Sequence, residues 1–245
     1  MAVRVETSGT VRVLRLDRPE KKNALTQAMY AALSAGLAAA EADPAVRAVV
    51  LAGGADFTAG NDLADFAGTR GDGPSEAFRF LQALRRFGKP LLAAVRGHAV
   101  GIGTTLLLHC DATVAAQDAR LLMPFTKLGL VPEGGSSLLL ARRVGAARAR
   151  WWLMAAAPIG GQEAAAAGLV TQAVPDGEVE ATAMAMAEAL AALPPEALRE
   201  TKRLLRAPDE AALDAAMDAE FTAFAERLRS EEAQAVFRAF LSRKG

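Results

Sequence analysis

The sequence predicts an α/β fold in which short buried strands alternate with helices and a helical C-terminal region follows. The strands are indicated by short apolar runs, many of them β-branched, such as residues 46–51 and 90–95. Stretches with apolar residues at helical spacing lie between these runs, and this alternation favours repeated β-β-α turns. From about Gln162 onward the strands nearly vanish, and Ala, Glu, Arg and Leu recur at helical periods. Residues 1–190 are therefore predicted to form the core, and 191–245 a helical region.

The first predicted element is a hairpin of two alternating strands, residues 3–6 and 11–16, around Ser8-Gly9. A helix is expected over residues 23–42, with Asn23 as its N-cap. The later elements follow the same criteria, with strands at 46–51, 90–95, 112–115 and 169–174, and helices at 75–87 and around 106–108. The C-terminal helices are too apolar on one face to stand alone in water, so they should pack on the core or on another subunit.

Composition restricts the class of protein. The chain has 245 residues, 52% hydrophobic and 23% charged, which is typical of an ordinary globular protein. Basic and acidic residues number 28 each, so no basic excess points to nucleic acid. One cysteine excludes an intramolecular disulfide, and two histidines give no zinc-ligand spacing. No signal-peptide pattern and no run of about 20 apolar residues is found, so we expect a cytoplasmic protein that does not enter the membrane.

Glu133 is the most informative residue. It is the only acid between Asp118 and Glu163, with apolar residues on one side and small residues on the other. A carboxyl group in such surroundings loses water, and its pKa rises toward the range useful for proton transfer. The alternative is an acid in the first turn of a helix that begins near Gly134, where the helix dipole favours negative charge.

Two glycine-containing loops, residues 57–63 and 97–105, each follow a predicted strand. The second opens into a helix, so its first amides, including that of Ile102, lack intrahelical partners. Two amides directed at one point make an oxyanion hole, which could stabilise the enolate of a thioester. Glycine loops can instead pack a strand on a helix or bind a nucleotide phosphate. A dinucleotide fingerprint is not complete, because Leu106 stands where its third glycine would be.

Four ordered motifs resemble the enoyl-CoA hydratase/isomerase (crotonase) superfamily. They are Arg18-Pro19 with Asn23-Ala24-Leu25, the segment 59–63, the segment 97–103, and Cys110-Asp111. The resemblance implies a crotonase-type spiral of β-β-α repeats with a C-terminal helical extension, and a homotrimer or dimer of trimers. It implies an acyl-CoA thioester as substrate, with no cofactor besides the CoA of the substrate. The amides of Asn61 and Ile102 are implied to form the oxyanion hole.

Departures from the family pattern indicate the reaction. Hydratases of this family carry two glutamates, and the matching positions here are Thr105 and Phe125. Neither side chain is a carboxylate base, and Phe125 would repel the water that hydration consumes. The segment Pro132-Glu133-Gly134, together with Pro124-Phe125, is similar to the Δ3,Δ2-enoyl-CoA isomerase branch, whose single catalytic glutamate lies in this motif. The resemblance implies that Glu133 moves a double bond from C3 to C2 during β-oxidation of unsaturated fatty acids.

The ligand-binding residues are also implied by the resemblance. The acyl pocket is assigned to Phe66, Phe125 and Leu128. Contacts with CoA are assigned to two N-terminal segments, the second loop and the C-terminus: Lys21, Lys22, Ala24, Ala59, Gly60, Asp62, Leu63, Gly101 and Arg243. The lysines and Arg243 could equally be solvated charges, and Asp62 could cap a turn.

Two other functions stay open at this point. The first is hydration, or another reaction of the family on an unusual acyl group, with Glu133 in a different role. The second is a non-catalytic protein that binds acyl-CoA or serves as a scaffold. The absence of both hydratase glutamates is compatible with that second reading, whereas the retained acid beside an oxyanion pair argues against it.

Overall fold

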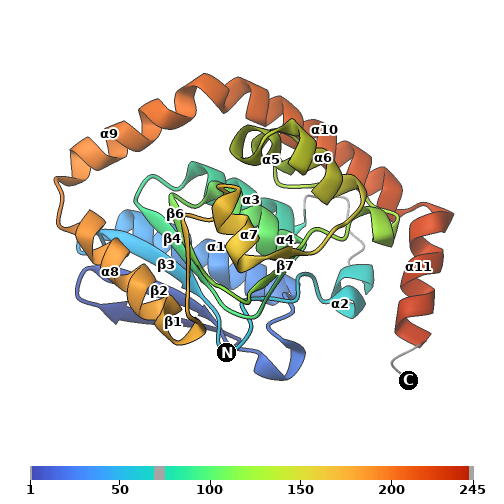
Figure 1. The fold of residues 1–245 in the computed structure, drawn as a ribbon, viewed down its shortest axis with the longest axis horizontal. Coiled ribbons are helices and arrows are strands. Elements are labelled where there is room, and N and C mark those ends of the chain that lie inside the picture. Colours follow the sequence, from blue (N-terminus) through green and yellow to red (C-terminus); the bar gives the residue numbers. More distant parts are fainter. Residues whose placement is uncertain (1, 69–74, 243–245) are drawn as a thin grey trace.

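A six-stranded sheet forms the centre of the computed structural model, which describes residues 2–68 and 75–242 (Figure 1). Its strand order is β1-β2-β3-β4-β6-β9, antiparallel between β1 and β2 and parallel thereafter. The strands are β1 Val3–Ser8, β2 Val11–Leu16, β3 Ala48–Ala52, β4 Leu91–Val95, β6 Ala112–Ala116 and β9 Gln172–Val174. The predicted hairpin and the predicted central strands are confirmed, with shifts of a few residues at the ends.

The three central strands are buried on both faces. Every residue of β3, β4 and β6 is buried, as expected of parallel strands covered on both sides, which show continuous rather than alternating apolar runs. The register pairs Val49 with Leu91 and Leu92 with Ala112. Because β3 and β4 align in this way, the loops that follow them leave the same edge of the sheet.

A second, three-stranded sheet was not predicted. It has the order β5-β7-β8, with strands β5 His98–Val100, β7 Arg120–Leu122 and β8 Ile159–Gly160. Strands of two or three residues are too short to show a period in sequence. This sheet turns the second glycine loop into an ordered platform, because β5 lies within that loop.

Eleven α-helices occur in the described part of the chain. They are α1 Gln27–Ala42, α2 Leu63–Gly68, α3 Glu76–Arg86, α4 Ile102–Thr105, α5 Ser136–Val144, α6 Ala146–Met154, α7 Gly161–Ala166, α8 Val179–Ala191, α9 Pro195–Arg206, α10 Glu210–Leu228 and α11 Glu231–Ser242. Short 3₁₀ helices lie at Pro19–Lys21, Leu106–His109, Thr126–Leu128, Asp176–Glu178 and Ala207–Asp209. The stretch around 106–108, predicted as helix, is therefore the 3₁₀ continuation of α4.

The prediction that Asn23 caps the first helix is wrong. Helix α1 begins at Gln27, and the hydroxyl of Thr26 accepts from the amide of Met29 as the N-cap. Asn23 has φ 56°, and its buried side chain accepts from Arg18 N at 2.7 Å and donates to the Asp56 carbonyl at 2.7 Å. Asn23 thus ties two loops together instead of starting the helix.

The C-terminal helices lie against the core, as predicted. Helix α8 packs across β3, β4 and β6, while α10 packs on α5. Met217 on α10 and Phe237 on α11 are buried. Figure 1 shows α9 and α10 as an arch over one end of the molecule, with α11 descending beside it. The predicted boundary at residue 190 falls within α8 and does not coincide with the end of an element. The division into a core and a C-terminal region stays a prediction.

None of the helices in residues 2–68 and 75–242 combines the length and apolarity that a membrane span requires.

Candidate active site

Glu133 lies in a loop between the 3₁₀ turn at Thr126–Leu128 and helix α5. The helix begins at Ser136 with Gly135 as its N-cap, so Glu133 stands outside the first helical turn and the helix-dipole alternative is wrong. Gly134 (φ 69°) and Gly135 (φ 74°) are both left-handed, a conformation that glycine adopts without steric cost. These two residues turn the chain between Glu133 and α5.

The carboxyl group of Glu133 faces Thr105, at the end of α4. The Thr105 hydroxyl donates a short hydrogen bond to Oε1 of Glu133. Burial raises the pKa of Glu133 to about 7; the Thr105 hydrogen bond opposes this, and the negative charge of Glu220 adds to it. A carboxyl group whose pKa lies close to ambient pH is suited both to accept and to return a proton. The predicted desolvation of Glu133 is therefore found in the structure.

Tyr30, on α1, belongs to the same site and carries no signal in the sequence. Its side chain is fully buried, and its hydroxyl donates to Oδ1 of Asn61 at 2.5 Å. Burial, and next the charge of Glu133, raise the pKa of Tyr30 well above its ordinary value. The phenol is therefore a neutral donor that fixes the side chain of Asn61.

The two glycine loops lie side by side. Thr58 N donates to the His98 carbonyl at 2.8 Å, and Val100 N donates to the Thr58 carbonyl at 3.0 Å. A Cβ atom at Gly60 would lie 2.7 Å from the Val100 carbonyl oxygen, so only glycine allows this approach. Asn61 and Ile102 follow these contacts directly.

The amides of Asn61 and Ile102 are free to bind a ligand oxygen. Neither donates to an acceptor within the residues that the structure describes. Ile102 is the first residue of α4, after Gly101 with φ 57°, and the first amides of a helix have no intrahelical acceptor. Thr105 is three residues further along α4, about one turn away. The Glu133 carboxyl group therefore contacts the same short helix that carries the Ile102 amide at its start.

His109, in the 3₁₀ helix that continues α4, also holds the Glu133 loop. Its Nε2 lies 2.7 Å from the carbonyl oxygen of Gly134, and because a carbonyl only accepts, this nitrogen carries the proton. Burial lowers the pKa of His109 to about 4, and the positive charges of Arg206, Arg143 and Arg85 act in the same direction. His109 is therefore neutral at physiological pH.

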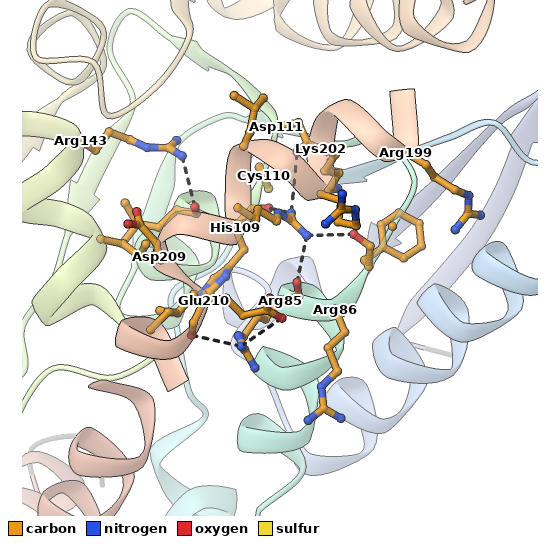
Figure 2. Close-up of a pocket in the computed structure, with 18 residues that line it drawn as sticks. Arg85, Arg86, His109, Cys110, Asp111, Arg143, Arg199, Lys202, Asp209 and Glu210 are labelled. Atoms are coloured by element: carbon orange, nitrogen blue, oxygen red, sulfur yellow. Dashed lines mark hydrogen bonds and ion pairs between the residues drawn. The ribbon is translucent and has the colours of Figure 1, made fainter. Parts of the chain in front are cut away.

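His109 also lines a cavity of about 570 Å³. In Figure 2, Arg143, Lys202 and His109 surround it, and helix α9 contributes Lys202. The lining does not include Glu133, Asn61 or Ile102. This cavity is therefore separate from the groups predicted to be catalytic.

The residues assigned to the acyl pocket are only partly described. Phe125 is buried, and Leu128 is half-buried against the core. The backbone of Phe66 is in α2, but its side chain lies outside the described residues. Leu81, on α3, also approaches the site, because a Cβ at Gly134 would lie 3.1 Å from its Cδ2. Leu81 thus lies against the Glu133 loop, and Phe125 is buried next to the turn that precedes it.

The segments assigned to CoA binding come together in space. Ala59 N donates to the Lys22 carbonyl at 2.8 Å, and Leu25 N donates to the Gly60 carbonyl at 2.8 Å. Lys21 and Lys22 are exposed, whereas Ala24, Ala59 and Leu63 are half-buried, and Gly101 lies in the adjoining loop. The assigned positions in residues 21–25, 59–63 and 101 therefore form one continuous area.

Asp62 and Arg243 are placed differently from the other assigned residues. The Asp62 carboxylate accepts from Arg18 at 2.7 Å and from the amide of Ala64 at 3.1 Å. It therefore caps the start of α2, as its alternative interpretation expected. Arg243 lies outside the described residues. No cluster of His, Cys, Asp and Glu that could hold a metal ion occurs in the described segments.

Comparisons with known proteins agree with this architecture. The family model described as enoyl-CoA hydratase/isomerase matches residues 6–245. The chain is 38% identical to a "probable enoyl-CoA hydratase" of Rhodobacter capsulatus, over 89% of this chain and 88% of that protein. It is 34% identical to enoyl-CoA delta isomerase 2 of Rattus norvegicus, over 98% of this chain and 63% of that protein. The crystal structure of an enoyl-CoA hydratase/isomerase from Pseudoalteromonas atlantica is 40% identical, with a TM-score of 0.94 and coverage of 99% and 98%.

Proposed function

The chain belongs to the enoyl-CoA hydratase/isomerase (crotonase) family of acyl-CoA enzymes, and within it we propose that the protein converts 3-enoyl-CoA to trans-2-enoyl-CoA. The observation that carries this proposal is the pairing of Glu133 with Thr105. Glu133 is half-buried, and desolvation raises the pKa of its carboxyl group to about 7. The position from which a second glutamate would act is a threonine that donates to it. One carboxyl group suffices for a reaction that returns the proton it removes.

In the proposed mechanism, ionised Glu133 removes a proton from C2 of the thioester. The C2–H electron pair enters the π system and forms a dienolate, with negative charge on the thioester oxygen and on C4. The amides of Asn61 and Ile102 donate to the oxygen, and preorganised donors of this kind each contribute roughly 3 kcal/mol to the transition state. The carboxylic acid of Glu133 then returns the proton to C4, which leaves the double bond between C2 and C3.

Phe125 and Leu81 support this chemistry by excluding water. Phe125 is buried beside the turn that precedes the Glu133 loop, and Leu81 lies against Gly134. A dienolate enclosed by apolar side chains keeps its proton on Glu133 between the two transfers. Hydration would instead require a positioned water molecule next to a second acid–base group.

The decisive experiment compares a 3-enoyl-CoA with crotonyl-CoA in parallel spectroscopic assays, with wild type, Glu133→Gln and Glu163→Gln. Glu163 is an exposed residue of α7, so its variant controls for the loss of a carboxylate. We expect wild type and Glu163→Gln to isomerise 3-hexenoyl-CoA. Glu133→Gln should lose about 10³-fold or more in kcat while still binding acyl-CoA. Near-full turnover by Glu133→Gln would refute the assignment.

Two other results would replace the proposal. Rapid hydration of crotonyl-CoA with no movement of the double bond in 3-hexenoyl-CoA would favour hydration, the activity in the name of the Rhodobacter relative. Tight acyl-CoA binding with no solvent deuterium entering C2 would favour a non-catalytic binding protein.

We also propose that Lys21 and Lys22 meet the phosphates of CoA and that no further cofactor takes part. The exposed position of both lysines beside the 59–63 loop supports the assignment of the phosphate contacts. Charge reversal of either lysine should raise KM for acyl-CoA and leave kcat nearly unchanged. A change in kcat alone would contradict the assignment.

A homotrimer or a dimer of trimers is proposed for the assembly. Trp151 and Met154 on α6 are 65% and 73% exposed, and Leu204 and Leu205 on α9 are 56% and 77% exposed. Exposed apolar side chains gathered on helices mark interaction surfaces. Light scattering should give the mass of three or six chains, and a monomer would contradict the proposal.

A further inference from the structure

Glu220 is a buried carboxylate in the middle of α10, within the C-terminal helices. It is 7% exposed. Its Oε2 accepts from the amide of Gly135 at 2.6 Å, and its Oε1 accepts from the amide of Ser137 at 2.8 Å. Both carboxylate oxygens therefore hold backbone amides at the start of α5, more than 80 residues earlier in the chain.

This contact supplies a cap that α5 lacks locally. The N-cap residue of α5 is Gly135, which has no side chain to accept from the first amides. A carboxylate near a helix N-terminus is also favoured by the helix dipole. Helix α10 and the loop are closely fitted, because a Cβ at Gly135 would lie 2.3 Å from Leu213 Cδ1.

The same contact fixes the loop that carries Glu133. His109 holds the carbonyl of Gly134, and Glu220 holds the amide of the next residue. The peptide unit that joins Gly134 to Gly135 is thus held at its carbonyl by the 3₁₀ helix 106–109 and at its amide by α10. The direction of the Glu133 side chain toward Thr105 depends on this backbone.

From these contacts we propose that Glu220 is a positioning residue, which holds the catalytic loop in place from α10 and puts a second negative charge near Glu133. The inference rests on the proposed function insofar as Glu133 is the base. It assigns the C-terminal helices a role in catalysis besides packing.

The groups that face Glu133 come from three elements packed around it. They are the hydroxyl of Thr105 on α4, the neutral phenol of Tyr30 on α1, and Glu220 on α10. Asp65 on α2 acts on Tyr30. Among these groups Glu220 alone raises the pKa of Glu133, and its contribution is smaller than that of burial. Removal of its charge should therefore move the ionisation of Glu133 to lower pH.

The test separates charge from geometry with two variants. Glu220→Gln removes the charge and replaces one acceptor oxygen by an NH₂ group that cannot accept from an amide. Glu220→Asp keeps the charge but is one methylene shorter, so it cannot reach both amides. Glu226→Gln, at an exposed position of the same helix, is the matched control.

We expect kcat for 3-hexenoyl-CoA to fall about tenfold or more in both Glu220 variants, because small misplacement of a catalytic group is costly. KM should stay within about twofold, since the proposed CoA contacts lie elsewhere. The acid limb of the pH profile of kcat/KM should move to lower pH in Glu220→Gln only. A folded Glu220→Gln variant with the wild-type kcat and the wild-type profile would overturn the proposal.

Hydrogen exchange covers the case in which neither variant folds. In the wild type, the amides of Gly135 and Ser137 should be strongly protected, and rapid exchange at both would overturn the proposal. This measurement needs no turnover. If the wild type does not isomerise 3-hexenoyl-CoA, the proposed function is wrong. The role of Glu220 can still be decided in that case, from hydrogen exchange at these two amides and from the effect of the Glu220 variants on whatever turnover is found.

Discussion

Replacing Thr105 by valine should shift the pH at which the enzyme becomes active. Thr105 is buried, and its hydroxyl donates to Oε1 of Glu133. Valine has nearly the same shape, so the change removes the donor with little effect on packing. The hydrogen bond favours the ionised carboxylate, because it lowers the pKa of Glu133 against the effect of burial.

The magnitude follows from the strength of a charged hydrogen bond. Such a bond contributes about 1.5–3 kcal/mol, and about 1.36 kcal/mol corresponds to one pH unit. The pKa of Glu133 should therefore rise by about one to two pH units from its value of about 7. At pH 7 the ionised fraction should fall from about a half to a tenth or less, and the rate should fall about fivefold or more.

The assay is the pH profile of kcat/KM for isomerisation of 3-hexenoyl-CoA. In Thr105→Val the acid limb should lie at higher pH, and activity should recover on the alkaline side. Thr201→Val, an exposed threonine on α9 whose hydroxyl donates to the Ala197 carbonyl, is the control and should keep the wild-type profile. An unmoved acid limb, or one moved to lower pH, would refute the account of Thr105.

Three further predictions concern stability and the oxyanion loop. The folded-state pKa of Glu133 is raised to about 7 from 4.5, so ionisation of Glu133 lowers the stability of the folded protein as pH rises through this interval. In urea unfolding at pH 8, Glu133→Gln should therefore be up to about 3 kcal/mol more stable than wild type. No gain in stability would contradict the burial of a charged carboxylate. The folded-state pKa of His109 is lowered to about 4 from 6.5, so its stabilising contribution is present above pH 6.5 and is lost as pH falls. Between pH 6.5 and 4 the free energy of unfolding of wild type should fall by about 3 kcal/mol because of this residue. His109→Gln should not show this loss. Gly60→Ala should lower kcat/KM about 100-fold, because φ is 85° and the new Cβ would lie 2.7 Å from the Val100 carbonyl oxygen; Gly54→Ala, where no atom lies within 4 Å, should retain activity.

The central strands and the desolvated state of Glu133 were predictable because both follow from local composition. Strands β3, β4 and β6 are continuous apolar runs, and Glu133 has no other acid near it in the sequence. The contacts that complete the site were not predictable, because they join distant segments. The bond from Thr105 to Glu133 spans 28 residues, and that from Gly135 to Glu220 spans 85.

Tyr30 and Asn23 show two different reasons why the sequence did not predict the role of a residue. In sequence, Tyr30 is an ordinary apolar position on the inner face of a helix, and only the fold directs its hydroxyl to Asn61. Asn23 precedes an apolar-periodic segment, as an N-cap would, but Thr26 competes for that role and is closer to the first helical turn. Its left-handed backbone reflects its bonds to other loops, which no local pattern reports.

Thr105 and Glu220 act on Glu133 in opposite directions, and their balance bears on the choice between one carboxyl group and two. Burial and the charge of Glu220 raise the pKa of Glu133, while the Thr105 hydrogen bond lowers it. A glutamate at position 105 would place a like charge where Thr105 now donates, and the pKa of Glu133 would rise further. Thr105 instead keeps Glu133 near half-ionised at neutral pH, the state in which one group can remove a proton at C2 and return it at C4. The replacement at position 105 thus favours the single-base reaction over hydration on electrostatic grounds, independently of the loss of the second base.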